Sequence, residues 1–486
     1  MTFNDVLPLA PVVAVVLAAA AVLVVDLAWP GRSAPALVTT FVGLGIAAAL
    51  VVVTGATPAD AFRGAYTVDA FTTFIDVLLI GIVVLTILFA PDYLEPRDLP
   101  IAEFAALMMF ALSGAMLIAG STDLLLLFLG LELMVLPGYL LAGFAKRDAL
   151  STEGAIKYFL LGSFSSAIFL FGLAYVWGLT GTTSIGGVAA ELGVMVESAG
   201  ISAGLALGLA LLTTGVAFKI AAVPFHYWTP DAYQGSPTPV TGYLSTLPKV
   251  GAFALILRLF VEALGPVSEE WAVVFVLLAA LTMTVGNLIA LTQDNVKRML
   301  AYSSIAHTGY MMVGLAAYAN GQVEGLEGLL YYGAAYAFMN LGAFAVVAAL
   351  QKRRGVTSSL ATFAGLGRRE PLLGVLMTLF LLSLVGIPPT AGFFAKAYII
   401  LAAVEAGGVL SFLAVLMVLN AAAAAFYYLR VVVYMFMREP ETEAPALSHG
   451  GLVWVGLFAA TILTIGLGLL PGPIIESVQD AASALL

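Results

Sequence analysis

The chain has 486 residues, of which 62% are apolar and only 10% are charged. Because soluble domains carry about a quarter charged residues, most of this sequence must contact lipid or other protein. The net charge of −10 argues against nucleic-acid binding, which needs basic surfaces, and the lack of cysteine excludes disulfides, iron–sulfur clusters and thiolate metal sites. The three histidines are too far apart in sequence to suggest a haem or a histidine-rich metal site.

Apolar runs of about 20 residues predict an all-α polytopic membrane protein with about 14 transmembrane helices. No long hydrophilic stretch remains for a separate soluble domain. The N-terminal segment lacks the positively charged start of a secretory signal, so we interpret it as the first span. The predicted spans cover residues 7–28, 36–54, 71–90, 101–119, 122–143, 153–177, 201–223, 237–263, 271–291, 298–318, 325–350, 371–404, 409–436 and 450–470.

The distribution of lysine and arginine supports this layout. Twelve basic residues fall in alternate loops, on one side of the predicted bundle, and only Arg63 falls in a loop on the other side. By the positive-inside rule, this asymmetry predicts that both termini lie on the non-cytoplasmic side. The simplest expected location is the cell inner (plasma) membrane. The twelve are Arg32, Arg97, Lys146, Arg147, Lys297, Arg298, Lys352, Arg353, Arg354, Arg368, Arg369 and Arg438.

Two predicted spans look broken. The seventh runs into Pro224 and Pro230, which remove backbone donors, and the twelfth contains Gly386, Pro388 and Pro389, which cannot continue a regular helix. Inside a bilayer, irregular backbone is tolerated only where protein or a water-filled cavity satisfies its polar groups. Paired interruptions in a membrane chain therefore indicate a transport site.

The two interruptions occupy equivalent places if spans four to eight and nine to thirteen form two five-helix units. Because five is odd, the second unit would cross the membrane in the opposite direction, which makes the two units an inverted repeat. The match lies in helix order, without a residue-by-residue repeat. We predict N-terminal helices 1–3 within residues 1–100, the two units at 101–264 and 265–437, and a final helix within 438–486.

Seven ionisable side chains fall inside the predicted spans. Glu132 lies about ten residues into its span, which corresponds to about 15 Å at helical rise and hence to mid-bilayer. A charge at that depth costs about 2.5–3.5 kcal/mol, so each such group needs a partner, water or a functional role. The other six are Lys157, Lys219, Lys249, Arg258, Lys396 and Arg430.

Three of these lysines are candidates for carrying protons, because they lie beside the interruptions. Lys219 immediately precedes the first, Lys396 follows the second, and Lys249 lies in the helix after the first. Burial disfavours the charged form of lysine and a nearby carboxylate favours it, so movement of Glu132 would switch Lys219 between holding and releasing a proton. Water and side chains of the tenth span would complete the relay, namely His307, Tyr302, Ser303 and Ser304.

Plainer interpretations remain open for several of these residues. Glu132 and Lys219 could form a static ion pair that fixes helix packing, while Lys249 and Lys396 have no carboxylate neighbour in sequence. His307 could be a neutral histidine bonded to a backbone carbonyl.

The sequence allows less specific interpretations of the remaining polar residues. Lys157 follows Glu153 by four residues, a favourable local pair, although a gate near the cytoplasmic side is the alternative. Arg258 and Arg430 are expected to be interface anchors whose side chains reach the membrane surface. His226 could line a cavity, and His449 is expected in a loop.

Nucleotide-binding motifs are missing from the sequence. Glycine pairs such as GLGIAA lie inside apolar helices, and no GxxxxGK[ST] segment occurs. We therefore expect any NADH, flavin or ATP chemistry to take place on another chain.

Five segments closely resemble a known family. They are LGLELMVLPGYLLAG, EGAIKYFLLGSFSSA, GVAFKIAAVPFHYWTPDAYQGSPTPVTGYLS, LTQDNVKRMLAYSSIAHTGYMM and LVGIPPTAGFFAK. These segments resemble subunit N of the proton-pumping NADH–quinone oxidoreductase, respiratory complex I, the counterpart of mitochondrial NADH dehydrogenase subunit 2. The resemblance runs through roughly residues 70–435, and the block from 215 to 245 is the most specific.

The resemblance implies a fold and a function. It implies fourteen transmembrane helices, two inverted five-helix units, and broken seventh and twelfth helices. It also implies an antiporter-like, proton-translocating membrane-arm subunit of an enzyme whose redox site lies on other chains. Matched by motif, Glu132 and Lys219 correspond to the family's glutamate–lysine pair, and Lys249 corresponds to its central lysine. Lys396 corresponds to the lysine of the second half-channel, and His307 and Lys157 correspond to further polar-axis residues.

The same resemblance implies partners and leaves alternatives. It implies no cofactor on this chain, and FMN, iron–sulfur clusters and quinone on partner subunits. The expected neighbours are the antiporter-like subunit M, small membrane subunits and the lipid bilayer, with no nucleic acid. Relatives resembling subunit M carry a glutamate at the position of Lys396, which argues against that member. The alternatives are a subunit of a multisubunit cation/proton antiporter and a purely structural membrane scaffold.

Overall fold

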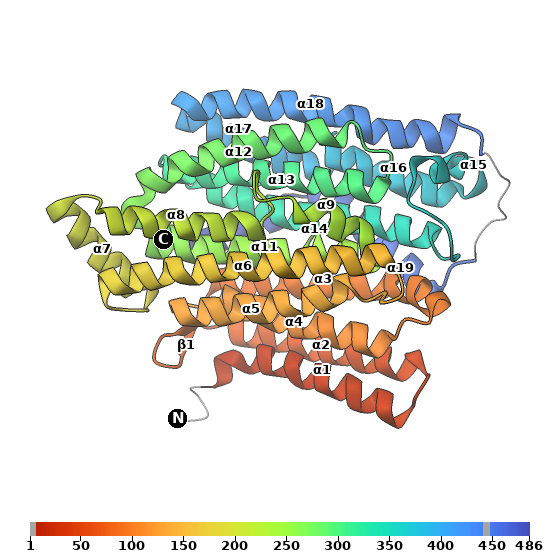
Figure 1. Ribbon diagram of the computed structural model, residues 1–486, viewed down its shortest axis with the longest axis horizontal. Helices are drawn as coiled ribbons and strands as arrows, with labels where there is room; N and C mark the ends of the chain where they lie inside the picture. The colour runs from red at the N-terminus through yellow and green to blue at the C-terminus, as the bar shows by residue number, and fades with distance from the viewer. Residues whose placement is uncertain (1–5, 441–447) are drawn as a thin grey trace.

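The computed structural model describes residues 6–440 and 448–486. Almost all of this part of the chain is helical, and the longer helices run roughly parallel to one another along the long axis of the molecule (Figure 1). Within these described ranges, eleven helical segments are long and apolar enough to cross a membrane. The predicted all-α, multi-span fold class is confirmed.

The first part of the chain forms α1 (Ala10–Ala28), α2 (Ser33–Gly55), α3 (Ala70–Leu94), α4 (Ile101–Ala119), α5 (Leu124–Ala142), α6 (Ala149–Thr180) and α7 (Ile185–Ala199). The middle part forms α8 (Ala203–Lys219), α9 (Trp228–Gly235), α10 (Thr238–Leu244), α11 (Leu247–Ile256), α12 (Ser268–Ala290), α13 (Val296–Ala319) and α14 (Glu324–Leu350). The last part forms α15 (Leu366–Arg369), α16 (Pro371–Val385), α17 (Ala391–Ala406), α18 (Gly408–Met437), α19 (Gly451–Leu469) and α20 (Gly472–Ser483). Strands β1 (Ala59–Ala61) and β2 (Tyr66–Val68) form an antiparallel hairpin.

Every predicted span coincides with one or more of these helices, and both predicted interruptions are confirmed. Helix α8 ends at Lys219, and the chain is irregular until α9, while α16 and α17 are separated by residues 386–390. The count of 14 crossings, the inverted repeat and the domain boundaries stay predictions. The sequence did not predict α7, α20 or the hairpin, because amphipathic helices of 15 and 12 residues and three-residue strands produce no apolar run of membrane length.

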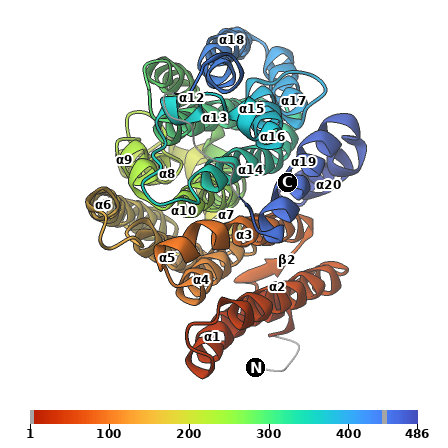
Figure 2. The ribbon, with the colours of Figure 1, turned by 90° about the vertical axis from the view of Figure 1, so that its right-hand side faces the viewer.

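The helices differ in how much of their surface is covered (Figure 2). In the segment that contains α10 and α11, the most apolar stretch of 18 residues is entirely buried inside the bundle. The corresponding stretch of α14 is 94% buried. Helices α1 and α2 lie at one edge of the bundle and α18 at the opposite edge, where many apolar side chains are exposed. Polar side chains on α13 are tolerated because that helix is enclosed by others, which can supply hydrogen-bond partners.

The two ends of the bundle have different loops. The segments that join α3 to α4, α5 to α6 and α14 to α16 lie at the right-hand end of Figure 1, and we call this the basic end. The β1–β2 hairpin and α7 lie at the left-hand end. The loops of the basic end include Arg97, Lys146, Arg147 and Arg354, whereas Arg63 belongs to the hairpin. The alternation inferred from the charges therefore agrees with the helix directions.

A buried ionic cluster at the basic end holds the start of α19 against the rest of the bundle. His449 lies in a loop, as expected, but its side chain is 1% exposed and lies 3.1 Å from a Glu370 oxygen and 3.6 Å from an Asp92 oxygen. Asp92 also contacts Lys352 at 3.1 Å. Burial lowers the pKa of His449, but hydrogen bonds to Asp92 and Glu370 outweigh burial, so the pKa lies above its ordinary value.

The raised pKa of His449 predicts a pH-dependent stability. Because the group binds its proton more tightly in the folded state, its contribution is fully present below about pH 6.5 and is lost as pH rises through the folded-state pKa. We expect the thermal unfolding temperature in detergent to fall between pH 6 and pH 8.5, and to fall less in His449→Gln. An identical pH dependence in the variant would contradict this assignment.

Candidate functional site

The first interruption begins where α8 ends, at Lys219. The irregular backbone that follows is satisfied by side chains from other helices. Val223 donates its N–H to Thr282 Oγ1 at 3.0 Å, Thr308 Oγ1 donates to the carbonyl of Ile220 at 3.0 Å, and Trp228 Nε1 donates to the carbonyl of Phe218 at 3.1 Å. The polar backbone groups at this break therefore have hydrogen-bond partners inside the bundle, as irregular backbone within a membrane requires.

Lys219 is held by α6 and not by a carboxylate. Its Nζ donates to Ser166 Oγ at 2.8 Å and lies 3.5 Å from the carbonyl of Gly162. Within the described residues, Glu132 makes no ion pair, and its Oε1 is buried without a hydrogen-bond partner. A static Glu132–Lys219 ion pair is therefore the wrong description of this arrangement.

Lys249 follows an interruption that the sequence did not predict. The predicted span 237–263 is divided between α10 and α11 at Ser245 and Thr246, and Lys249 lies in the first turn of α11. Its Nζ donates to both the carbonyl and Oγ of Ser304 at 2.6 Å, and its side chain is 4% exposed. Pro248, at the start of α11, was the available sequence signal for this division.

A threonine connects the first interruption to Lys249. Thr308 Oγ1 lies within hydrogen-bond distance of two carbonyl oxygens, that of Ile220 at 3.0 Å and that of Ser304 at 3.1 Å. The Ser304 carbonyl also accepts from Lys249. Helix α13 therefore links the residue after Lys219 to the ammonium group of Lys249.

His307 lies at the centre of a group of tyrosines. Its Nδ1 is 2.6 Å from the hydroxyl of Tyr332, and its Nε2 is 3.3 Å from the hydroxyl of Tyr428. The alternative in which His307 bonds to a backbone carbonyl is therefore wrong. The tyrosine hydroxyls leave both ring nitrogens with a partner that can donate or accept.

Two further hydroxyl side chains predicted for the relay, those of Ser303 and Tyr302, lie in different places. Ser303 hydrogen-bonds to the Tyr428 hydroxyl, so it belongs to the group around His307. Tyr302 instead lies near Arg298, whose guanidinium is 6.0 Å from the ring centroid.

Lys396 closes the second interruption. Its Nζ, from α17, donates to the carbonyls of Leu384 and Val385 at 2.9 and 2.6 Å, so it caps the C-terminal end of α16. A cation is favourable there because the carbonyl end of a helix is electronegative. Gly386 has a φ of +93°, and a Cβ at this residue would lie 3.0 Å from Lys396 Cδ, so glycine is needed both for the turn and for the lysine.

Two tyrosine rings connect His307 to the two buried lysines. The Tyr336 ring centroid lies 5.1 Å from that of His307 and 5.3 Å from Lys249 Nζ. The Tyr310 ring centroid lies 5.5 Å from that of His307 and 5.1 Å from Lys396 Nζ. We call the five residues Lys249, Tyr336, His307, Tyr310 and Lys396 the central line. Nothing in the sequence singled out these tyrosines, because tyrosine is common in apolar helices.

Lys157 lies apart from the central line, in an ion-pair network near α9. Its Nζ is 2.6 Å from Glu153 and 2.7 Å from Asp231, and Asp231 is 2.7 Å from Arg298. The predicted local pair with Glu153 is confirmed. The sequence did not identify Asp231, which joins Lys157 on α6 to Arg298 on α13.

Two basic residues differ from the expectations, and the structure also places Arg430 and His226. Arg258 is 2% exposed in its side chain, so it is no interface anchor; it pairs with Asp69 at 2.7 Å and Glu262 at 2.5 Å. Lys297 is not a loop residue but lies in the first turn of α13, with Nζ 2.5 Å from the carbonyl of Ser236. Arg430 donates to the carbonyl of Gln293 as an anchor would, and His226 is buried and stacked on Tyr227.

Replacing Arg258 tests whether its cluster is structural. Arg258→Met is expected to lower the free energy of unfolding by about 3 kcal/mol, because it leaves Asp69 and Glu262 largely buried without their cation. Thermal unfolding in detergent would measure the loss. Arg368→Met is the control, since that arginine is 68% exposed and 3.9 Å from an exposed glutamate, and it should change stability little. Equal losses would contradict the assignment.

Comparison with known proteins identifies the family. The family described as NADH:quinone oxidoreductase/Mrp antiporter, TM, matches residues 121–422. A relative from Trichlorobacter lovleyi named NADH-quinone oxidoreductase subunit N is 41% identical over 447 residues, which cover 91% of this chain and 89% of the relative. A relative of the same name from Chloroflexus aggregans is 44% identical over 441 residues, covering 89% and 87%.

Solved structures agree with these relatives. A chain of respiratory complex I from Thermus thermophilus with bound aureothin is 33% identical, with a TM-score of 0.79 and coverage of 96% of this chain and 99% of that one. A chain of the Mrp complex from Dietzia sp. shares the fold, with a TM-score of 0.87 at 23% identity and coverage of 100% and 98%. The curated names favour a complex I subunit over a subunit of a multisubunit cation/proton antiporter. The chain therefore belongs to the NADH-quinone oxidoreductase subunit N family, within the wider family of antiporter-like membrane subunits.

Proposed function

We propose that this chain moves protons across the membrane along the central line, as an antiporter-like membrane-arm subunit of an NADH-quinone oxidoreductase. One observation carries the proposal. Lys249, His307 and Lys396 lie far apart in sequence, yet Tyr336 and Tyr310 connect them in the protein interior. A structural scaffold has no need to keep two lysines and a histidine in one buried series, where each charge is costly.

The geometry supports proton transfer in short steps. Lys249 holds a hydroxyl and a carbonyl of Ser304, so its ammonium can release a proton to that hydroxyl or to an adjacent water while the amine stays bound. His307 can accept a proton at one ring nitrogen and release another from the second, because each faces a tyrosine hydroxyl. Lys396 can hold the proton next, with its ammonium on the carbonyls of α16. Because the rings are in van der Waals contact, water would have to bridge the ammonium, imidazole and hydroxyl groups beside them to complete the series.

The energy needed is of the size that these contacts can supply. Moving one charge through 100 mV requires about 2.3 kcal/mol. A hydrogen bond to a charged group contributes about 1.5–3 kcal/mol, so making or breaking one such bond at a lysine matches the requirement. We propose that Glu132 provides this control at Lys219, because its buried, unbonded oxygen is free to take a new partner when the interior rearranges. Lys157 and Asp231 would serve the basic end of the route.

The proposal extends to the setting of the chain. FMN, iron–sulfur clusters and quinone would belong to partner subunits, with no redox site on this chain, and the neighbours would be subunit M and small membrane subunits. The basic end would face the cytoplasm, which places both termini on the other side of the inner membrane. The units 101–264 and 265–437 would contribute one interruption each, together with Lys219 and Lys396 respectively.

Proton stoichiometry tests the proposal. The complex that contains this chain would be reconstituted in vesicles, and the protons moved per two electrons would be measured with a pH-sensitive dye. Lys396→Met is expected to lower this ratio while quinone reduction continues. An unchanged ratio in a fully assembled complex would overturn the proposal and favour the structural scaffold.

A further inference from the structure

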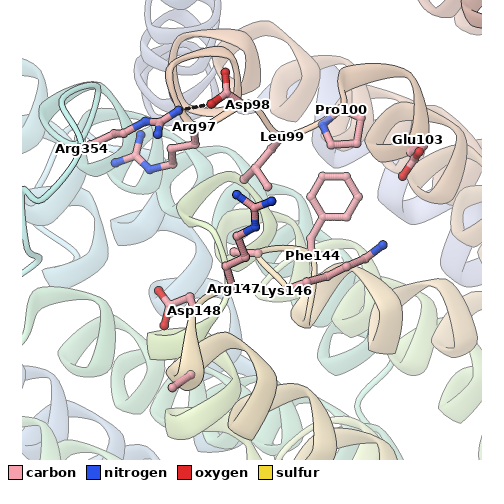
Figure 3. A pocket seen from close by; sticks show the side chains of 12 residues that line it. Arg97, Asp98, Leu99, Pro100, Glu103, Phe144, Lys146, Arg147, Asp148 and Arg354 are labelled. Atoms are coloured by element: carbon pink, nitrogen blue, oxygen red, sulfur yellow. Dashed lines mark hydrogen bonds and ion pairs between the residues drawn. The ribbon is translucent and has the colours of Figure 1, made fainter.

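Two adjoining hollows at the basic end form one groove that the proton-transfer site does not use. The larger, of about 770 Å³, lies between the α3–α4 and α5–α6 loops, with Arg354 on its far side (Figure 3). The smaller, of about 470 Å³, runs between α4, α5 and α6. They share Glu103, Phe144 and Lys146 in their walls, so they are continuous. We call the pair the interfacial groove.

The charged side chains of the larger hollow leave a net positive charge, because four basic residues line it against three acidic ones: Arg97, Lys146, Arg147 and Arg354 against Asp98, Glu103 and Asp148. Arg354 pairs with Asp98, and Asp148 Oδ1 accepts a hydrogen bond from the N–H of Leu150 at the start of α6. Lys146 and Arg147 are exposed, and neither forms an ion pair with any residue in the described parts of the chain. Figure 3 shows Arg147 extending from its loop toward Leu99 and the side chain of Arg97.

The smaller hollow is apolar and lies on the side of the bundle that faces outward. Leu107, Leu140 and Ile156 line it. Leu140 and Ile156 are 63% and 52% exposed, so the hollow opens along the outer surface of the spans instead of into the interior. A ligand that filled both hollows would have an anionic head beside Lys146 and Arg147 and an apolar tail beside α4, α5 and α6.

We propose that the interfacial groove binds an anionic phospholipid. The groove lies where the spans meet their loops, which is the depth of lipid headgroups. Basic pockets between transmembrane helices suit lipid phosphates, to which lysine and arginine donate charge-assisted hydrogen bonds. The apolar extension distinguishes a phospholipid from free phosphate or from an acidic peptide, neither of which would need an exposed hydrocarbon channel.

Lipid retention by the purified chain tests the proposal. The protein would be purified in mild detergent, exchanged into mixed micelles of phosphatidylcholine and phosphatidylglycerol, and analysed by native mass spectrometry for the phospholipids that stay bound. The unaltered chain is expected to retain phosphatidylglycerol in preference to phosphatidylcholine. Lys146→Gln with Arg147→Gln is expected to weaken phosphatidylglycerol retention roughly 30-fold, the effect of two basic residues near the surface.

Two further variants separate the head and tail contributions. Arg368→Gln with Arg438→Gln removes the same charge from the same end but outside the groove, and it should leave retention unchanged. Ile156→Trp, which fills the exposed apolar channel, should also lower retention. Equal loss in both double variants, or no preference for phosphatidylglycerol in the unaltered chain, would overturn the proposal. These measurements involve no proton transport, so they are independent of the proposed function.

Discussion

Lys249→Met and Lys249→Arg are both expected to reduce proton transport by this subunit to background while leaving the chain folded. Methionine removes the ammonium group, and arginine keeps a positive charge that does not release its proton in proteins. If Lys249 served only to supply a buried charge, the arginine variant would retain transport. If Lys249 served only to fill space, the methionine variant would retain transport. Loss in both variants is therefore specific to a group that exchanges a proton.

The measurement is the number of protons moved per two electrons by the reconstituted complex. Lys297→Met is a matched control, because Lys297 is also 4% exposed and also donates to a serine carbonyl, yet lies outside the central line. We expect that variant to retain transport. Full transport in either Lys249 variant, with the complex assembled, would show that this lysine carries no proton.

Glu132→Gln is expected to lower proton transport by at least roughly 10-fold, equivalent to about 1.4 kcal/mol in a barrier, without lowering thermal stability. Transport and stability should respond differently because Glu132 Oε1 is buried without a hydrogen-bond partner. Replacing the carboxylate by an amide therefore removes no stabilising hydrogen bond at that atom. A carboxylate kept in such a place is maintained for function at the expense of stability.

A double-mutant cycle shows whether Glu132 acts through Lys219. Transport would be measured in Glu132→Gln, Lys219→Met and the double variant. If the carboxylate controls the lysine, the double variant should be no worse than Lys219→Met, because the second substitution removes a group that no longer has a target. Additive losses would show two independent roles. A large drop in unfolding temperature for Glu132→Gln would show that the carboxylate is structural.

Much of this arrangement was predictable from the sequence because membranes penalise irregular backbone and buried charge so strongly. Pro224, Gly386, Pro388 and Pro389 lie in the two breaks, as expected of residues that cannot continue a helix, whereas Pro230 lies in the first turn of α9. Lys249 and Lys396 had no carboxylate in their own sequence neighbourhood, and in the structure their ammonium groups bond to carbonyl and hydroxyl oxygens instead. Residues that are energetically costly inside a membrane were therefore reliable sequence signals for the breaks and for the buried lysines.

The partners of those residues were not predictable, because they depend on which helices become neighbours. Tyr310 and Tyr336 look like ordinary core aromatics until α13, α14 and α17 bring them between His307 and the lysines. Arg258 looked like an anchor because Asp69 precedes it by 189 residues, although its second partner, Glu262, lies only four residues later and was visible in the sequence. The division between α10 and α11 was missed although Ser245, Thr246 and Pro248 interrupt the apolar residues there, because the segment as a whole still has the length and composition of one span.

Infrared difference spectroscopy tests most directly whether buried lysines change protonation during turnover. Spectra of the complex at rest and during turnover would be compared for protein carrying unlabelled lysine or lysine labelled with ¹⁵N at Nζ only, so that isotope-sensitive bands report on the side-chain nitrogen. Exchange between ammonium and amine forms should give bands that weaken in Lys249→Met with Lys396→Met, where Lys219 alone of the buried lysines proposed as proton carriers remains, and that persist at full strength in Lys297→Met. If turnover produces no isotope-sensitive lysine band in the active complex, these ammonium groups are permanent charges and the central line does not carry protons.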